Sequence, residues 1–177
     1  MTILVDIDST ITNFGEVLLF VNNINNKTKY SYTDITTYNW FDETFDNPWE
    51  PTNYHHFWDG VQVHPQAVST LEQWVKQGHK VYLVTASHFN NTLGYKIYKT
   101  LEPFNPEFIN ERNIIIARDK SIVQGTIMID DYEENLNNFN GIKVCYAQPW
   151  NEKRSNYLLR TSDWNKIKGM IETIPFN

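Results

Sequence analysis

The chain of 177 residues has one cysteine, seven glycines and no long hydrophobic run. Its only thiol, Cys145, cannot form a disulfide within the chain and lies in an apolar run, so we expect it to be buried in a protein of the reducing cytoplasm. The longest apolar runs, such as 17–21, are far too short to span a bilayer, which argues against a membrane partner. The first residues show no basic region or cleavage-site pattern, so we expect no export signal.

Basic residues are missing from a long internal stretch. No Lys or Arg occurs from Tyr30 through Val75, where seven Asp and Glu residues and many aromatic residues lie. This stretch and the net charge of -6 argue against a nucleic-acid polymer as partner, because proteins that bind one normally present a basic surface. The aromatic side chains could still stack on a single flat ring whose phosphate is held elsewhere.

Short apolar runs alternate with amphipathic segments in the rest of the chain. The apolar runs predict strands at residues 2–5, 80–84, 113–117, 126–129 and 142–146. The helical spacing predicts helices at residues 14–24, 65–78, 91–101, 132–139 and 162–174. The turn-rich, aromatic stretch 27–65 is interpreted as an inserted, partly helical lobe. This alternation is typical of an α/β fold, with a parallel sheet and helices on both faces.

Polar residues follow four of the predicted strands. They are Asp6 and Asp8, then Thr85, whose hydroxyl is followed by the backbone N–H of Ala86, then Lys120, and then Asp130 and Asp131. Each residue alone would be explained as a turn former, a helix cap or a surface charge. Because ligands of an open parallel sheet bind beyond the carboxyl ends of the strands, the joint arrangement predicts one shared site there.

The residue types at this predicted site suit a metal ion and a phosphate group. Mg²⁺ prefers oxygen ligands, and Asp6 with Asp130 or Asp131 would supply them. Phosphoryl transfer mainly needs correct positioning and neutralisation of charge. The Thr85 hydroxyl, the backbone N–H groups that follow it and the Lys120 ammonium would serve this purpose.

Several of these residues resemble the motifs of a known superfamily. The segment Asp6-Ile7-Asp8-Ser9-Thr10 resembles the first motif of the haloacid dehalogenase (HAD) superfamily, and the other three motifs are matched by Thr85, Lys120 and Asp130-Asp131. Within that superfamily, Arg118-Asp119-Lys120 followed by Ile129-Asp130-Asp131 is similar to the 5'(3')-deoxyribonucleotidases. Phe14 matches the aromatic residue with which those enzymes contact the substrate.

This resemblance implies a fold, a cofactor and a reaction. The fold would be a Rossmann-like core of residues 1–13 and 65–177, with a small, mostly helical cap at residues 14–64, inserted after the first strand. The cofactor would be Mg²⁺. The reaction would be hydrolysis of a phosphomonoester through an aspartyl-phosphate intermediate, and the substrate a deoxynucleoside monophosphate, which is a small-molecule partner.

The resemblance also implies roles for individual residues. Asp6 would be the nucleophile and a metal ligand, and Asp8 would be the general acid and then the general base, with its carbonyl oxygen on the metal. Asp130 would be a further metal ligand, supported by Asp131. The substrate and its phosphate would be bound by Phe14, Thr85, Ala86 and Arg118. Lys120 would be a catalytic residue that neutralises the phosphate.

Some residues depart from this pattern. Ser9 stands where the superfamily usually has Gly, Ala86-Ser87 follows Thr85 where the animal enzymes have Ser-Pro, and Tyr132 stands where the branch commonly has Arg. His88, just after the predicted phosphate loop, is a further candidate substrate contact.

Other functions remain open from the sequence. The alternatives are a phosphatase of another small ester, such as a sugar phosphate or pyridoxal phosphate, and a non-catalytic binding protein with the same fold. Repair of polynucleotide ends is a third alternative, which the acidic stretch disfavours. The sequence does not determine the oligomeric state, although it is compatible with a homodimer.

Overall fold

The computed structural model of this chain describes residues 1–86, 91–152 and 157–175. Its centre is a six-stranded sheet in the order β3-β2-β1-β4-β5-β6, in which every neighbouring pair is parallel. The strands are β1 (Thr2–Asp6), β2 (Lys80–Thr85), β3 (Ile114–Ile116), β4 (Ile127–Asp130), β5 (Ile142–Tyr146) and β6 (Leu159–Thr161). The predicted α/β class with a parallel sheet is confirmed. The edge strand β6 was not predicted, because its three half-buried residues form no apolar run.

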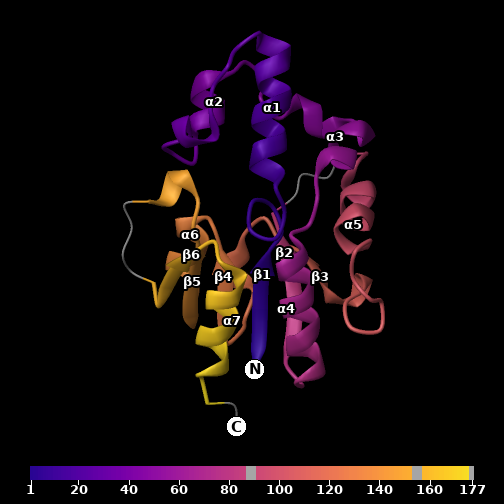
Figure 1. The fold of residues 1–177 in the computed structure, drawn as a ribbon, viewed down its shortest axis with the longest axis vertical. Coiled ribbons are helices and arrows are strands. Elements are labelled where there is room, and N and C mark those ends of the chain that lie inside the picture. Colours follow the sequence, from indigo (N-terminus) through magenta and orange to yellow (C-terminus); the bar gives the residue numbers. More distant parts are fainter. Residues whose placement is uncertain (87–90, 153–156, 176–177) are drawn as a thin grey trace.

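Helices cover both faces of this sheet (Figure 1). The α-helices of the described residues are α1 (Phe14–Asn26), α2 (Trp40–Thr44), α3 (His55–Gly60), α4 (Pro65–Lys76), α5 (Leu93–Leu101), α6 (Glu133–Asn138) and α7 (Trp164–Glu172), and those on the sheet include α4, α6 and α7. Alternate residues of β1 point to opposite faces, so Ile3 and Val5 join the core beneath α4 and α7, while Leu4 joins a smaller cluster with Leu136 of α6. No helix in the described part of the chain is long and apolar enough to cross a membrane.

The helices α1, α2 and α3 lie beyond the carboxyl ends of the strands (Figure 1). They share an apolar cluster of their own, separate from the two clusters on the sheet: Phe14, Leu18, Leu19, Ile35, Phe41, Phe45, Phe57, Trp58 and Val61. Because this segment has its own buried cluster, we propose to treat residues 14–64 as a cap segment over a core of residues 1–13 and 65–177.

The chain passes between the core and the cap segment twice, and the two connecting stretches lie side by side. The outgoing and returning chains pair at a bridge between Thr12 and Val63. Ser9 has a positive φ of 58°, and its Oγ accepts a hydrogen bond of 3.1 Å from the backbone N–H of Gly15 at the start of α1. A Cβ atom at Gly15 would lie 2.8 Å from the hydroxyl oxygen of Tyr32, so a larger residue here would have to displace that side chain. The junction therefore fixes where α1 stands above β1.

The buried thiol on β5 gives a testable prediction. Cys145 is fully buried, as the sequence predicts, and burial raises the pKa of its thiol to about 12. Because the thiolate is the reactive form, we expect no reaction with a thiol reagent at about pH 8 in the native protein. Full reaction is expected in denaturant, where the thiol pKa returns to roughly 8.5. Rapid stoichiometric labelling of the native protein would contradict this description of β5.

Candidate active site

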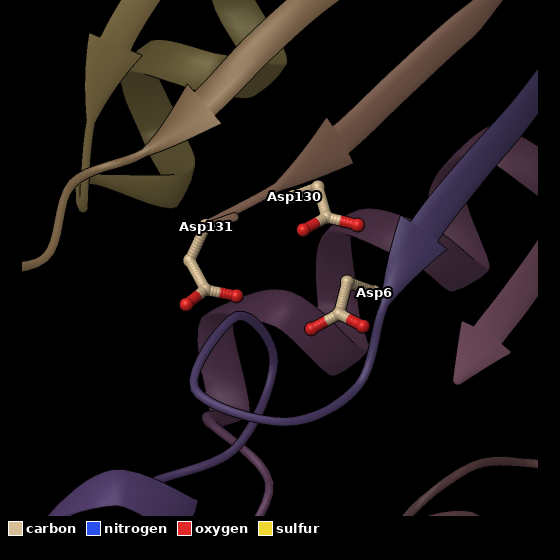
Figure 2. Close-up of side chains that lie close together, drawn as sticks. All are labelled: Asp6, Asp130 and Asp131. Atoms are coloured by element: carbon tan, nitrogen blue, oxygen red, sulfur yellow. The ribbon is translucent and has the colours of Figure 1, made fainter. Parts of the chain in front are cut away.

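Three carboxylates meet at the carboxyl ends of two neighbouring strands. Asp6 is the last residue of β1 and Asp130 the last of β4, and Asp131 follows directly. All three are buried, and each places a carboxylate oxygen within 4.8 Å of the others. Figure 2 shows the three side chains pointing toward one common space. Parallel pairing of β1 with β4 is what brings residues so distant in sequence together.

A buried lysine neutralises part of this negative charge. Lys120, in the short 3-10 helix Lys120–Ile122, contacts Asp6 and donates a hydrogen bond of 2.8 Å from Nζ to Asp130 Oδ2. Burial opposes the charged form of Lys120, but the charges of Asp130 and Asp6 outweigh it, so the pKa of the ammonium is raised. Lys120 therefore stays a cation between two of the three acids.

The carboxylates of Asp130 and Asp131 are also held by neutral donors. Asp131 accepts hydrogen bonds from the Thr10 hydroxyl at 3.2 Å and from the indole N–H of Trp150 at 2.9 Å. Asp130 accepts from the backbone N–H of Tyr132 at 2.9 Å and from the amide of Asn135. Burial, followed by the charges of the neighbouring acids, raises the pKa of Asp131.

The donor set fits a divalent cation. Three carboxylates gathered against one lysine leave unbalanced negative charge, and buried charges of one sign are costly unless they are compensated. Hard cations such as Mg²⁺ and Ca²⁺ bind through carboxylate oxygens. Asp6, Asp130 and Asp131 can therefore hold a metal ion. The predicted ligands Asp6 and Asp130 are among them, and the binding of metal by Asp6, Asp8 and Asp130 stays a prediction.

Asp8 belongs to a second charged group beside the first. Its Oδ2 is contacted by Lys96 of α5 and accepts a weak hydrogen bond of 3.4 Å from the Thr85 hydroxyl. Lys96 also donates to Thr85 Oγ1 at 3.0 Å. The other oxygen, Asp8 Oδ1, is buried and has no hydrogen-bond partner among the described residues. Asp8 is thus held at one oxygen, while the other has no hydrogen-bond partner among the described residues.

Lys96 is a site residue that the sequence reasoning missed. It is 3% exposed and lies between Thr92 and Thr100 on the buried stripe of α5. A polar stripe at spacing i, i+4 on the inner side of a core helix is the signal that could have found it. Lysine is almost never fully buried unless it is paired, so a lysine in such a stripe indicates a buried acid opposite.

A cavity of about 240 Å³ opens above these groups, between the sheet and the cap segment. Its floor includes Asp6, Asp8 and Ala86, and the cap segment lines it with the aromatic side chains of Phe14, Phe41, Trp49 and Trp58. Phe14 is nearly buried and packs on Trp58 with ring centroids 5.7 Å apart. Phe14 therefore contributes both to the cap cluster and to the cavity wall.

Two further residues were predicted to bind phosphate or substrate, namely Thr85 and Arg118, and neither is among the described residues that line the cavity. Thr85 is fully buried beneath the cavity and reaches it through Asp8 and Lys96. Arg118 is exposed and is not among the described residues that line the cavity, so its contact with substrate stays a prediction. Ser87 and His88 lie outside the described residues.

Solved structures with the same fold belong to one class of enzyme. A HAD family hydrolase from Deinococcus radiodurans, solved with bound phosphate and sodium, matches with a TM-score of 0.64 and 10% identity, covering 96% of this chain and 94% of that one. A hydrolase from Pseudomonas syringae matches with a TM-score of 0.61 and 14% identity, covering 99% of both chains. At these identities the likeness shows the fold, which is the α/β fold of the HAD hydrolases.

A family model identifies the family to which the chain belongs within this class of hydrolases. The model described as "5' nucleotidase, deoxy (Pyrimidine), cytosolic type C protein" matches residues 1–175, and the chain belongs to this family. A 5'(3')-deoxyribonucleotidase of Clostridium acetobutylicum is 32% identical over 67% of this chain and 63% of that protein. One of Bacillus subtilis is 33% identical over 51% of each. These alignments thus span between half and two thirds of the curated relatives.

Proposed function

We propose that this protein is a magnesium-dependent phosphomonoester hydrolase that forms an aspartyl-phosphate on Asp6. The observation that carries the proposal is the position of the Asp6 carboxylate. It lies on the floor of the cavity, beside Asp130 and Asp131 and in contact with Lys120. When bound to these acids, Mg²⁺ would neutralise charge and polarise the phosphoryl group.

In the first step, a carboxylate oxygen of Asp6 attacks phosphorus while the bond from phosphorus to the ester oxygen breaks. Asp8 gives a proton to the departing oxygen, which leaves as an alcohol. Asp8 Oδ1, which has no hydrogen-bond partner among the described residues, suits this role because Lys96 and Thr85 occupy the other oxygen. Lys120 offsets the negative charge gathered around Asp6 as the phosphoryl group arrives.

In the second step, the Asp8 carboxylate takes a proton from a water molecule, and the resulting oxygen attacks the phosphorus of the aspartyl-phosphate. The bond between phosphorus and Asp6 breaks, which releases inorganic phosphate, restores the Asp6 carboxylate and leaves Asp8 protonated for the next cycle. Splitting one difficult displacement into two easier ones is the general advantage of covalent catalysis.

The proposed substrate is a deoxynucleoside monophosphate. The matched relatives from Clostridium and Bacillus are named 5'(3')-deoxyribonucleotidases. Beyond its acidic floor, the cavity presents aromatic faces that suit a single base. Its basic residues in the described lining are Lys96 and Lys120, and both contact carboxylates, so no free cation there favours a second phosphate. A cytoplasmic location and a homodimer stay predictions.

A substrate panel tests this proposal. With Mg²⁺ present, we expect deoxynucleoside monophosphates to be hydrolysed faster than ribonucleotides and sugar phosphates, and far faster than 5'-phosphorylated oligonucleotides. The measurement is phosphate release as kcat/KM for each ester. A sugar phosphate that exceeds every nucleotide would replace the nucleotidase with the alternative small-ester phosphatase.

The contribution of the base can be isolated at Phe14. Phe14→Leu keeps an apolar side chain in the cap cluster but removes the ring face. Because a base stacked on an aromatic ring is worth roughly 1–3 kcal/mol, we expect kcat/KM for a deoxynucleotide to fall about ten- to a hundredfold. The value for glycerol phosphate, which has no ring, should change little. Phe20→Leu is the matched control, because Phe20 lies on the same helix but is 65% exposed. Equal losses on both esters would mean that Phe14 supports only the fold.

A further inference from the structure

A pair of stacked tyrosines stands between two hollows of the protein. Tyr38 precedes α2 and Tyr132 follows Asp131 directly, and their ring centroids are 3.7 Å apart with an interplanar angle of 24°. Both rings line the catalytic cavity, and both also line a neighbouring hollow of about 500 Å³. Asp131 and Trp150 are shared by the two linings as well. The tyrosine stack is therefore part of the wall between the two hollows.

The two hollows differ in their chemistry. The catalytic cavity is largely aromatic above its charged floor, as described above. The neighbouring hollow is lined mainly by polar and acidic side chains of the segments 36–39 and 133–138. A group that passed from one hollow to the other would leave an aromatic surface for a hydrated, negatively charged one.

The wall depends on side chains more than on the backbone around it. The backbone N–H of Tyr132 holds Asp130 Oδ1 at 2.9 Å, and truncating the side chain leaves that bond in place. The Tyr132 hydroxyl donates to Glu134 at 2.6 Å, on the side of the neighbouring hollow. Tyr38 belongs to the cap segment and is 48% exposed, so its ring also has solvent on one side. Removing either ring would open the wall and leave the metal-binding carboxylates where they are.

We propose that the Tyr38–Tyr132 stack is a specificity determinant that limits the size of the group esterified to the phosphate. It does so by closing a cavity of about 240 Å³ off from the adjoining hollow. This inference rests on the proposed phosphatase function. Its feature in the sequence is Tyr132, the residue directly after Asp131.

The test compares two uncharged aryl leaving groups of different size, which avoids repulsion by Glu133 and Glu134. Phosphate release from phenyl phosphate and from the much larger naphthol AS phosphate is measured for the wild type, Tyr38→Ala and Tyr132→Ala. Because steric discrimination in a pocket is worth about tenfold or more, each alanine variant should raise the kcat/KM ratio of large to small ester by about that factor. Tyr38→Phe and Tyr132→Phe keep the stacked rings and should retain the wild-type ratio. Tyr98→Ala removes an exposed tyrosine of α5 away from the wall and serves as the matched control.

The outcomes separate this inference from the proposed function. Folded alanine variants that release phosphate with an unchanged ratio would overturn the wall and leave the phosphatase standing. A wild type that releases phosphate from no ester at all would overturn both. If one alanine variant does not fold, the ratio measured for the other decides.

Discussion

Replacing Asp6 with asparagine is expected to lower phosphate release by at least about a thousandfold, since removing a catalytic nucleophile has effects of this size or larger. The amide introduced by this substitution has nearly the shape of the carboxylate but is not a nucleophile toward phosphorus. The fold should persist, because burial and the neighbouring acids disfavour the charge at this position, as the raised pKa of Asp6 indicates. Lys120 also keeps its bond to Asp130 in the variant.

Two measurements make this expectation specific. Thermal unfolding should show that Asp6→Asn is no less stable than the wild type, so that lost activity reports chemistry. Asp163→Asn is the matched control: Asp163 caps α7 on the core, an asparagine also caps a helix, and its activity should be unchanged. Turnover by Asp6→Asn within tenfold of the wild-type rate would rule out Asp6 as the nucleophile.

Removal of divalent metal is expected to have the second large effect. Exhaustive chelation should stop phosphate release, and Mg²⁺ should restore it better than Ca²⁺, because Ca²⁺ takes more ligands in a looser geometry. Asp130→Ala removes one of the three gathered carboxylates and should raise the Mg²⁺ concentration needed for half-maximal activity sharply. Full activity after chelation would contradict the metal-dependent mechanism.

Metal binding can also be followed without turnover. A ligand that binds only the folded protein raises its melting temperature, so Mg²⁺ should stabilise the wild type and have a smaller effect on Asp130→Ala. Glu172→Gln, at the exposed end of α7, changes one charge away from the site and should respond to Mg²⁺ as the wild type does. An identical shift in Asp130→Ala would move the metal site elsewhere.

The sequence was sufficient to predict the parts of the site that lie on strands. Asp6 and Asp130 each end a short apolar run, and a parallel sheet necessarily brings such ends together. Lys120 could be included because it follows the third predicted strand within a matched motif. For these residues local pattern and topology agree, which is why their positions could be inferred without coordinates.

The parts of the site that depend on packing between segments could not be predicted in this way. Lys96 reaches Asp8 because α5 turns one polar stripe inward, and only the packed helix shows which stripe that is. The stack of Tyr38 on Tyr132 joins two loops that carry no periodic pattern. Such contacts arise from how segments distant in sequence pack on one another, and a strand or helix period does not encode that packing.

Chemical trapping of the phosphorylated enzyme tests the central claim most directly. Wild-type protein turning over a deoxynucleoside monophosphate with Mg²⁺ is quenched in acid and treated with borohydride, which reduces an aspartyl-phosphate to homoserine. Peptide mass spectrometry then locates the changed residue. We predict homoserine at position 6, dependent on both substrate and Mg²⁺, and none in Asp6→Asn. Homoserine at another aspartate, or unmodified Asp6 in an enzyme that turns over and is quenched in steady state, would contradict the account.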